Sequence, residues 1–269
     1  MIKGLILCEG NSDQILLGQL LQKRKNWKLK KNLNNAPYVE QNIAWYENTA
    51  KELFGIWYVR GDSNFIPAVQ SVFKRELFEH TVESLLVVTD NDDNSDVDDR
   101  ITKIFSEIAK TLKIGSEHLE QQLQTESKSG WQDISFYNSF ANVTKSEDSE
   151  EDPFEKSVVH FGFLLIPEEC NGALETYMLK ALCESSDSRH EVADKVHDFV
   201  ARFNTESKYN VFLKRRRDKI KAELGMFVSV INPDKMFDTL KELIESVDWS
   251  KFDLTNSQFS MLLDDGYFD

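Results

Sequence analysis

Two short apolar runs, each followed at once by acidic side chains, constrain the fold of this chain more than any other feature. Residues 4–8 read Gly-Leu-Ile-Leu-Cys and lead into Glu9 and Gly10. Residues 85–89 read Leu-Leu-Val-Val-Thr and lead into Asp90-Asn91-Asp92-Asp93. Such a run is too short for a buried helix and is typical of a strand that is covered on both faces. The two runs therefore predict two strands of a buried, mostly parallel sheet.

Helical patterns alternate with the apolar runs along the first two thirds of the chain. Further strands are expected at 56–59 and 158–166, with helices at 12–24, 67–78, 97–112 and 173–183. This alternation predicts βαβ units and an α/β fold, with a mostly parallel central sheet flanked by helices. Ser12 is the expected N-cap of the first helix. We interpret residues 26–46, which Pro37 interrupts, as an extended loop.

The last third of the chain has a different pattern, since its expected elements are mostly helical. The expected helices are at 189–203, 209–224 and 233–244. Before them, a short strand is expected within 131–140, and the acidic segment near 144–155 is interpreted as a flexible insertion. We therefore predict one α/β domain over residues 1–185, with a helical C-terminal extension over 186–269 packed on it.

Glu9, Asp90 and Asp92 follow the carboxyl ends of the expected strands, where sites form in open α/β sheets. Crowded carboxylates repel one another, so we expect a hard divalent cation, usually Mg²⁺, to compensate them. If the strand geometry continues past Thr89, Asp90 and Asp92 point to the same side. The alternative for Asp90–Asp93 is a turn that local side-chain hydrogen bonds stabilise.

A strand that ends in Glu9-Gly10, joined to a second strand that ends in Asp90-x-Asp92, resembles the TOPRIM fold of topoisomerases, primases and some nucleases. The pattern is similar to small standalone TOPRIM-like proteins and to the nuclease half of the OLD (overcoming lysogenization defect) family. Asp13 stands where that half typically has an acidic residue. The resemblance covers roughly residues 1–180. It implies that Glu9 is a metal ligand or general base and that Asp90 and Asp92 hold Mg²⁺ or Mn²⁺.

The same resemblance implies that Asp13 and Glu175 help to hold a second metal ion. Glu175 falls in the first turn of the helix that follows a buried strand, and it matches a Gly-x-x-Glu-like element of similar TOPRIM-like proteins. For both residues the alternative is an acidic first-turn side chain that the helix dipole favours.

A nuclease also needs positive charge to offset the charge that develops on the scissile phosphate. In the basic segment 214–221, Asp218, Lys219 and Lys221 match an Asp-Lys-x-Lys-like element of standalone TOPRIM-like proteins. We predict Lys219 first, and then Lys221, as the residue that stabilises the transition state. The predicted nucleic-acid-binding residues are Arg215, Arg216, Lys219 and Lys221. The alternative is a solvated basic face of a helix.

The composition excludes several classes of protein. A net charge of −14 argues against coating of nucleic acid without regard to sequence. Cys8, Cys170 and Cys183 have neither disulfide numbers nor zinc spacing, which fits a reducing cytoplasm. No apolar stretch reaches the roughly 18 residues of a membrane span. There is no P-loop motif, so the chain departs from full-length OLD nucleases, which join an ATPase to the TOPRIM part.

Together these patterns predict a TOPRIM-like Mg²⁺-dependent phosphodiesterase that acts on DNA or RNA, with control by a partner ATPase as one option. The alternative from another class is a non-catalytic TOPRIM-fold effector or partner-binding subunit. The sequence leaves open the natural substrate, whether the chain acts alone, and whether it forms a homo-oligomer.

Overall fold

A seven-stranded sheet lies at the centre of the computed structural model, in the order β2-β3-β4-β1-β5-β7-β6. The structure describes residues 2–30, 42–79, 82–91, 96–112, 130–137, 156–166, 173–183, 186–205, 212–214 and 216–233, together with residues 242, 244, 245, 259 and 262. The strands are β1 (Ile2–Cys8), β2 (Lys28–Lys30), β3 (Ile43–Glu47), β4 (Leu53–Tyr58), β5 (Val82–Asp90), β6 (Gly130–Tyr137) and β7 (Lys156–Ile166).

The four inner strands of the sheet are parallel to one another. β1 pairs with β4 on one side and with β5 on the other, and β5 pairs with β7. Antiparallel pairing occurs only towards the two edges of the described sheet, where β3 and β2 follow β4 and where β6 follows β7. The predicted α/β fold with a mostly parallel central sheet is therefore confirmed.

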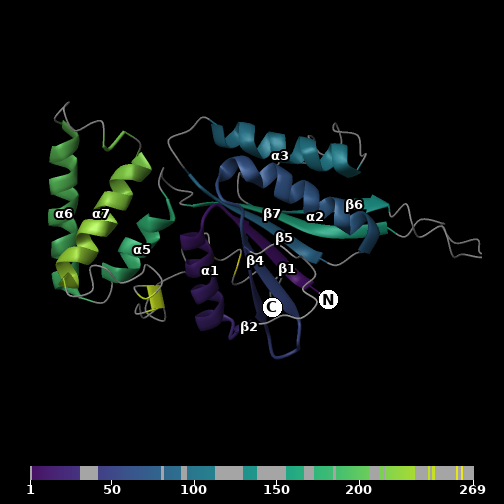
Figure 1. Cartoon of the computed structure of the whole chain (residues 1–269), viewed down its shortest axis with the longest axis horizontal. Coiled ribbons are helices and arrows are strands. Elements are labelled where there is room, and N and C mark those ends of the chain that lie inside the picture. The colour runs from purple at the N-terminus through teal and green to yellow at the C-terminus, as the bar shows by residue number, and fades with distance from the viewer. Residues whose placement is uncertain are drawn as a thin grey trace, which may run out of the picture.

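Helices cover both faces of this sheet (Figure 1). They are α1 (Asn11–Arg24), the short 3-10 helix η1 (Asp62–Asn64), α2 (Phe65–Glu79), α3 (Asp96–Leu112), α5 (Leu174–Cys183), α6 (Asp187–Thr205) and α7 (Arg216–Ile231). α2 and α3 lie together on one face and α1 lies on the other, while α5, α6 and α7 group beyond the carboxyl ends of the parallel strands. No helix among the described residues is long and apolar enough to cross a membrane.

The sheet separates two hydrophobic cores, because successive side chains of a strand point to opposite faces. Leu5 and Leu7 of β1 belong to the core under α2 and α3, whereas Ile6 belongs to the core under α1. That second core also contains Leu224 and Phe227 of α7. Residues of α5 and α7 therefore belong to the same core as α1, although these helices lie beyond the carboxyl ends of the strands.

Several expectations about local structure were wrong. The segment 26–46 contains β2 and the start of β3, an antiparallel edge pair, rather than one extended loop. α1 begins at Asn11, so Gly10 and not Ser12 is the N-cap. The helix expected at 209–224 is α7, which runs from Arg216 to Ile231. The segment 144–155 lies outside the described residues, and the domain boundary near residue 185 stays a prediction.

Candidate functional site

Glu9 extends β1 at its carboxyl end and reaches across to β5. The parallel register pairs Cys8 with Val88, so Glu9 comes to lie beside Thr89 and Asp90. The Glu9 Oε1 atom accepts a hydrogen bond from Thr89 Oγ1 at 2.5 Å and a second one from the Asp90 backbone N–H at 3.3 Å. Of the predicted convergence of Glu9, Asp90 and Asp92 at one end of the parallel sheet, the part that concerns Glu9 and Asp90 is confirmed, while Asp92 lies outside the described residues.

Asp90 connects the sheet to the N-terminus of α5. Its Oδ1 atom accepts a hydrogen bond from the Leu174 backbone N–H at 3.1 Å. Leu174 is the first residue of α5, so a strand carboxylate satisfies one of the unpaired N–H groups at the start of a distant helix. This long-range contact differs from the local turn that was the alternative for Asp90–Asp93. It also brings the first turn of α5, with the buried Glu175, next to the sheet.

Asp13 lies in the first turn of α1, above the end of β1. Its Oδ2 atom accepts a hydrogen bond from the Gly10 backbone N–H at 2.8 Å, and Ser12 Oγ donates to its Oδ1 atom at 3.4 Å. The Gly10 contact caps the start of α1, and Asp13 is also an acidic first-turn residue that the helix dipole favours, which was the alternative to metal binding. Asp13 therefore stabilises the start of α1 and also lies near the carboxylate of Glu9, as its electrostatics show.

The pKa of Asp13 is raised to about 7, from an ordinary value of 3.8. Burial is the largest cause, because a charged carboxylate loses hydration there. The hydrogen bond from Gly10 opposes the shift, the negative charges of Glu175 and Glu9 add to it, and the positive charge of Lys221 lowers it. The charges that shift the pKa of Asp13 therefore come from the end of β1, from α5 and from α7.

The pKa of Asp90 is raised well above its ordinary value for similar reasons. Burial contributes most, followed by repulsion from Asp13, Glu9 and Glu175, while the Leu174 N–H acts in the opposite direction. Four carboxyl groups from two strands and two helices therefore influence one another. We call Glu9, Asp13, Asp90 and Glu175 the acidic cluster.

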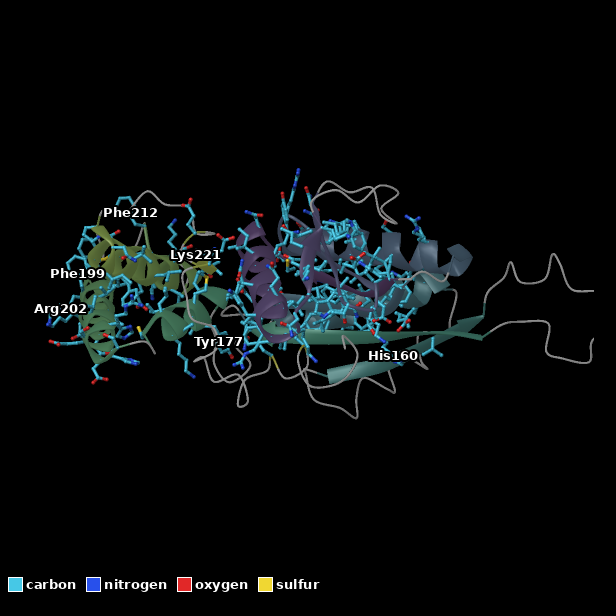
Figure 2. All side chains as sticks on the ribbon, turned by 90° about the horizontal axis from the view of Figure 1, so that it is seen from below. His160, Tyr177, Phe199, Arg202, Phe212 and Lys221 are labelled. Carbon is cyan, nitrogen blue, oxygen red and sulfur yellow. The ribbon has the colours of Figure 1, made fainter. Side chains whose placement is uncertain are left out.

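Lys221 of α7 supplies a positive charge to this cluster. Its Nζ atom lies 3.5 Å from Glu175 Oε1; the Lys221 side chain is 54% exposed and the Glu175 side chain 10% exposed. In Figure 2, Lys221 lies on the side of α7 nearer the sheet, whereas Phe199 and Phe212 lie farther from it. The C-terminal helices therefore contribute directly to the site.

For the remaining predicted site residues, the structure shows no contact with the acidic cluster or does not describe the side chain. Lys219 lies in α7 two positions before Lys221, about 200° around a helix with 3.6 residues per turn, so the two side chains do not share a face. Asp92 and Arg215 lie outside the described residues, as does the side chain of Arg216. Their predicted roles, and that of Lys219, stay predictions.

The model of a family described as "Protein of unknown function (DUF3226)" matches residues 3–250. The chain belongs to the DUF3226 family. The matched span includes the whole acidic cluster and Lys221. No curated protein matches the sequence. Among solved structures, the crystal structure of a hypothetical protein from Pyrococcus horikoshii OT3 is similar, with 13% identity, a TM-score of 0.46 and 98% of each chain covered.

The donor atoms of the acidic cluster fit a hard divalent cation, since every donor is a carboxylate oxygen. In the described part of this DUF3226 chain, however, no group of three or more His, Cys, Asp or Glu side chains is arranged to hold an ion as it stands. Without a cation, burial and the neighbouring carboxylates raise the pKa of Asp13 and of Asp90, which disfavours the ionised forms that would bind a metal ion. The donor chemistry is suitable, but the described side chains do not form a complete ligand set.

Two hydrogen-bond donors of the site were not predicted from the sequence of this DUF3226 member. One is the Leu174 N–H, which no side-chain pattern could reveal. The other is Thr89, a hydroxyl at the end of an otherwise apolar strand. Its polarity at a buried position was a usable signal, since buried hydroxyl groups nearly always have hydrogen-bond partners.

Proposed function

We propose that this chain is a divalent-metal-dependent phosphodiesterase of the TOPRIM type that acts on DNA or RNA. The observation that carries the proposal is the convergence of Glu9 and Asp90 from adjacent parallel strands. Asp13 and Glu175 join them from two helices, and the pKa values of Asp13 and Asp90 in this group are raised, chiefly by burial. Such groups are more common at functional sites than elsewhere, because their burial is unfavourable for folding.

In the proposed site, Glu9, Asp90 and Asp92 hold one Mg²⁺ or Mn²⁺ ion, and Asp13 and Glu175 help to hold another. Bound divalent metal supplies an activated water and stabilises charge on the phosphate oxygens. The residues of the chain orient the ligands and hold a proton at the site. The Asp90 backbone N–H and the Thr89 hydroxyl orient Glu9. Asp13, with a pKa of about 7, is able to hold a proton near neutral pH and to release it when the site fills.

Among the residues that the structure describes, Lys221 best fits stabilisation of the scissile phosphate. It is half exposed, so it is accessible to a substrate, and its ion pair with Glu175 holds it beside the acidic cluster. Lys221 also lies three positions before Leu224, which is buried in the core that contains residues of α5, so the two residues are neighbours on the surface of α7. The burial of Leu224 therefore helps to place Lys221 beside Glu175 of the acidic cluster.

Lys221→Ala should lower metal-dependent cleavage by about 10- to 100-fold, because one positive group beside the transferring phosphoryl is lost. Lys219→Ala is the matched control, since it removes the same charge from another face of α7, and we expect less than about a 3-fold change. Initial rates of cleavage of a fluorescent oligonucleotide would measure both. The reverse order of effects would assign the role to Lys219, as the sequence alone predicted.

Incubation of the purified chain with plasmid, single-stranded DNA and RNA tests the proposed function. We expect cleavage of at least one substrate with Mg²⁺ or Mn²⁺ and none with EDTA. A net charge of −14 favours a second candidate, a non-catalytic effector or partner-binding subunit, because overall negative charge opposes contact with phosphate backbones. Metal binding without cleavage of any substrate would support that candidate. Control by a partner ATPase is compatible with both.

A further inference from the structure

Thr89 is a buried polar residue at the carboxyl end of β5. Its side chain is only 2% exposed, and it follows four apolar residues of the same strand. A buried hydroxyl normally needs a hydrogen-bond partner. Here Thr89 Oγ1 donates to the carboxylate of Glu9, which belongs to the neighbouring strand-end motif. The buried hydroxyl of Thr89 is therefore directed at a proposed metal ligand.

The contact between Thr89 and Glu9 restrains one oxygen atom of the Glu9 carboxylate. At 2.5 Å it is as short as hydrogen bonds between a hydroxyl and a charged carboxylate, which are about twice as strong as neutral ones. The Asp90 N–H reaches the same oxygen at the longer distance of 3.3 Å. The β1–β5 register sets the position of Thr89 relative to Glu9. The position of the Glu9 carboxylate oxygen that accepts from the Thr89 hydroxyl therefore depends on the pairing of the two strands.

We propose that Thr89 is a positioning residue that holds Glu9 in the orientation required to bind a divalent cation at the acidic cluster. The inference rests on the proposed function and adds a residue that acts through Glu9 rather than on the substrate. Hydrogen-bond donors behind metal ligands orient those ligands, and their loss commonly weakens metal affinity by about 10- to 100-fold. Thr89 is suited to this role because the sheet backbone holds it and bulk water cannot compete for its hydroxyl.

Thr89→Val removes the hydroxyl and retains a side chain of similar shape, while Thr89→Ser retains the hydroxyl. Titration calorimetry with Mn²⁺ alone should show an affinity about 10- to 100-fold weaker in Thr89→Val and within about 3-fold of wild type in Thr89→Ser. Thr89→Ala serves as a second variant without the hydroxyl if Val disturbs the packing. Thermal unfolding in EDTA would establish that each variant is folded.

Ser84→Ala is the matched control, since Ser84 is also a buried hydroxyl of β5, 1% exposed, but lies towards the amino end of the strand. It should leave the Mn²⁺ affinity unchanged. Equal weakening by Thr89→Ser and Thr89→Val, or an unchanged affinity in Thr89→Val, would overturn the role of Thr89 alone. Failure of wild type to bind Mn²⁺ would overturn the proposed metal site as well.

Discussion

Glu9→Gln should lower metal-dependent cleavage by at least about 100-fold while the protein stays folded. Glutamine keeps the size of the side chain and an oxygen that can accept the hydrogen bonds from Thr89 and Asp90. It removes the negative charge that a metal ligand or general base requires. Because changes behind a metal ligand already cost about 10- to 100-fold, loss of the ligand itself should cost at least the upper end of that range.

Glu83→Gln is a suitable control, because Glu83 lies on β5 towards the opposite end of the sheet, where it pairs with Lys3 at 3.2 Å. Initial cleavage rates of both variants should be measured at the same Mg²⁺ concentration. Full activity in Glu9→Gln would remove Glu9 from the catalytic site. Equal losses in both variants would indicate a general effect on folding.

Asp13→Asn should make the metal-free protein more stable than wild type at pH 8, by roughly 2–4 kcal/mol from a shift of about three pKa units. The folded state holds its proton up to a pKa of about 7, whereas the unfolded state releases it near 3.8. Wild type therefore loses stability as the pH rises from about 4 to about 7. Asparagine is neutral throughout and can still accept the hydrogen bond from Gly10.

Urea unfolding in EDTA at several pH values between 4 and 8 would measure this difference. The advantage of Asp13→Asn should disappear towards pH 4, and saturating Mg²⁺ at pH 8 should reduce it by stabilising wild type. Asp187→Asn is a matched control, because Asp187 is an exposed acid in the first turn of α6. An Asp13→Asn protein less stable than wild type at pH 8 would instead indicate that Asp13 serves only as a helix-capping acid.

The main elements of the fold could be predicted because the inner strands are buried on both faces. Continuous apolar runs at 4–8 and 85–89 have few alternatives in a globular chain. Since both end in acids and parallel strands end at the same side, the contact between Glu9 and Asp90 also followed from the sequence. Edge strands gave a weaker signal: β2 is Lys-Leu-Lys, mostly exposed, and was interpreted as loop.

The contribution of α7 could not be predicted at the level of single residues. The basic segment was recognised, with Lys219 predicted ahead of Lys221, but nothing in the local pattern showed which face of the helix packs, and the role of Lys219 stays a prediction. The buried face of α7 is the one with Leu224 and Phe227, and its burial depends on tertiary contacts between distant segments. The hydrogen bond from Leu174 to Asp90 is unpredictable for the same reason.

Anomalous diffraction from a crystal soaked in Mn²⁺ would test the central claim most directly, because it locates the ion without reliance on a chosen substrate. We expect a peak at the acidic cluster, with oxygen atoms of Glu9 and Asp90 in its coordination sphere. A second peak near Asp13 and Glu175 would support the two-ion form of the site. The absence of any peak at the acidic cluster at saturating Mn²⁺ would contradict the proposed metal-dependent function.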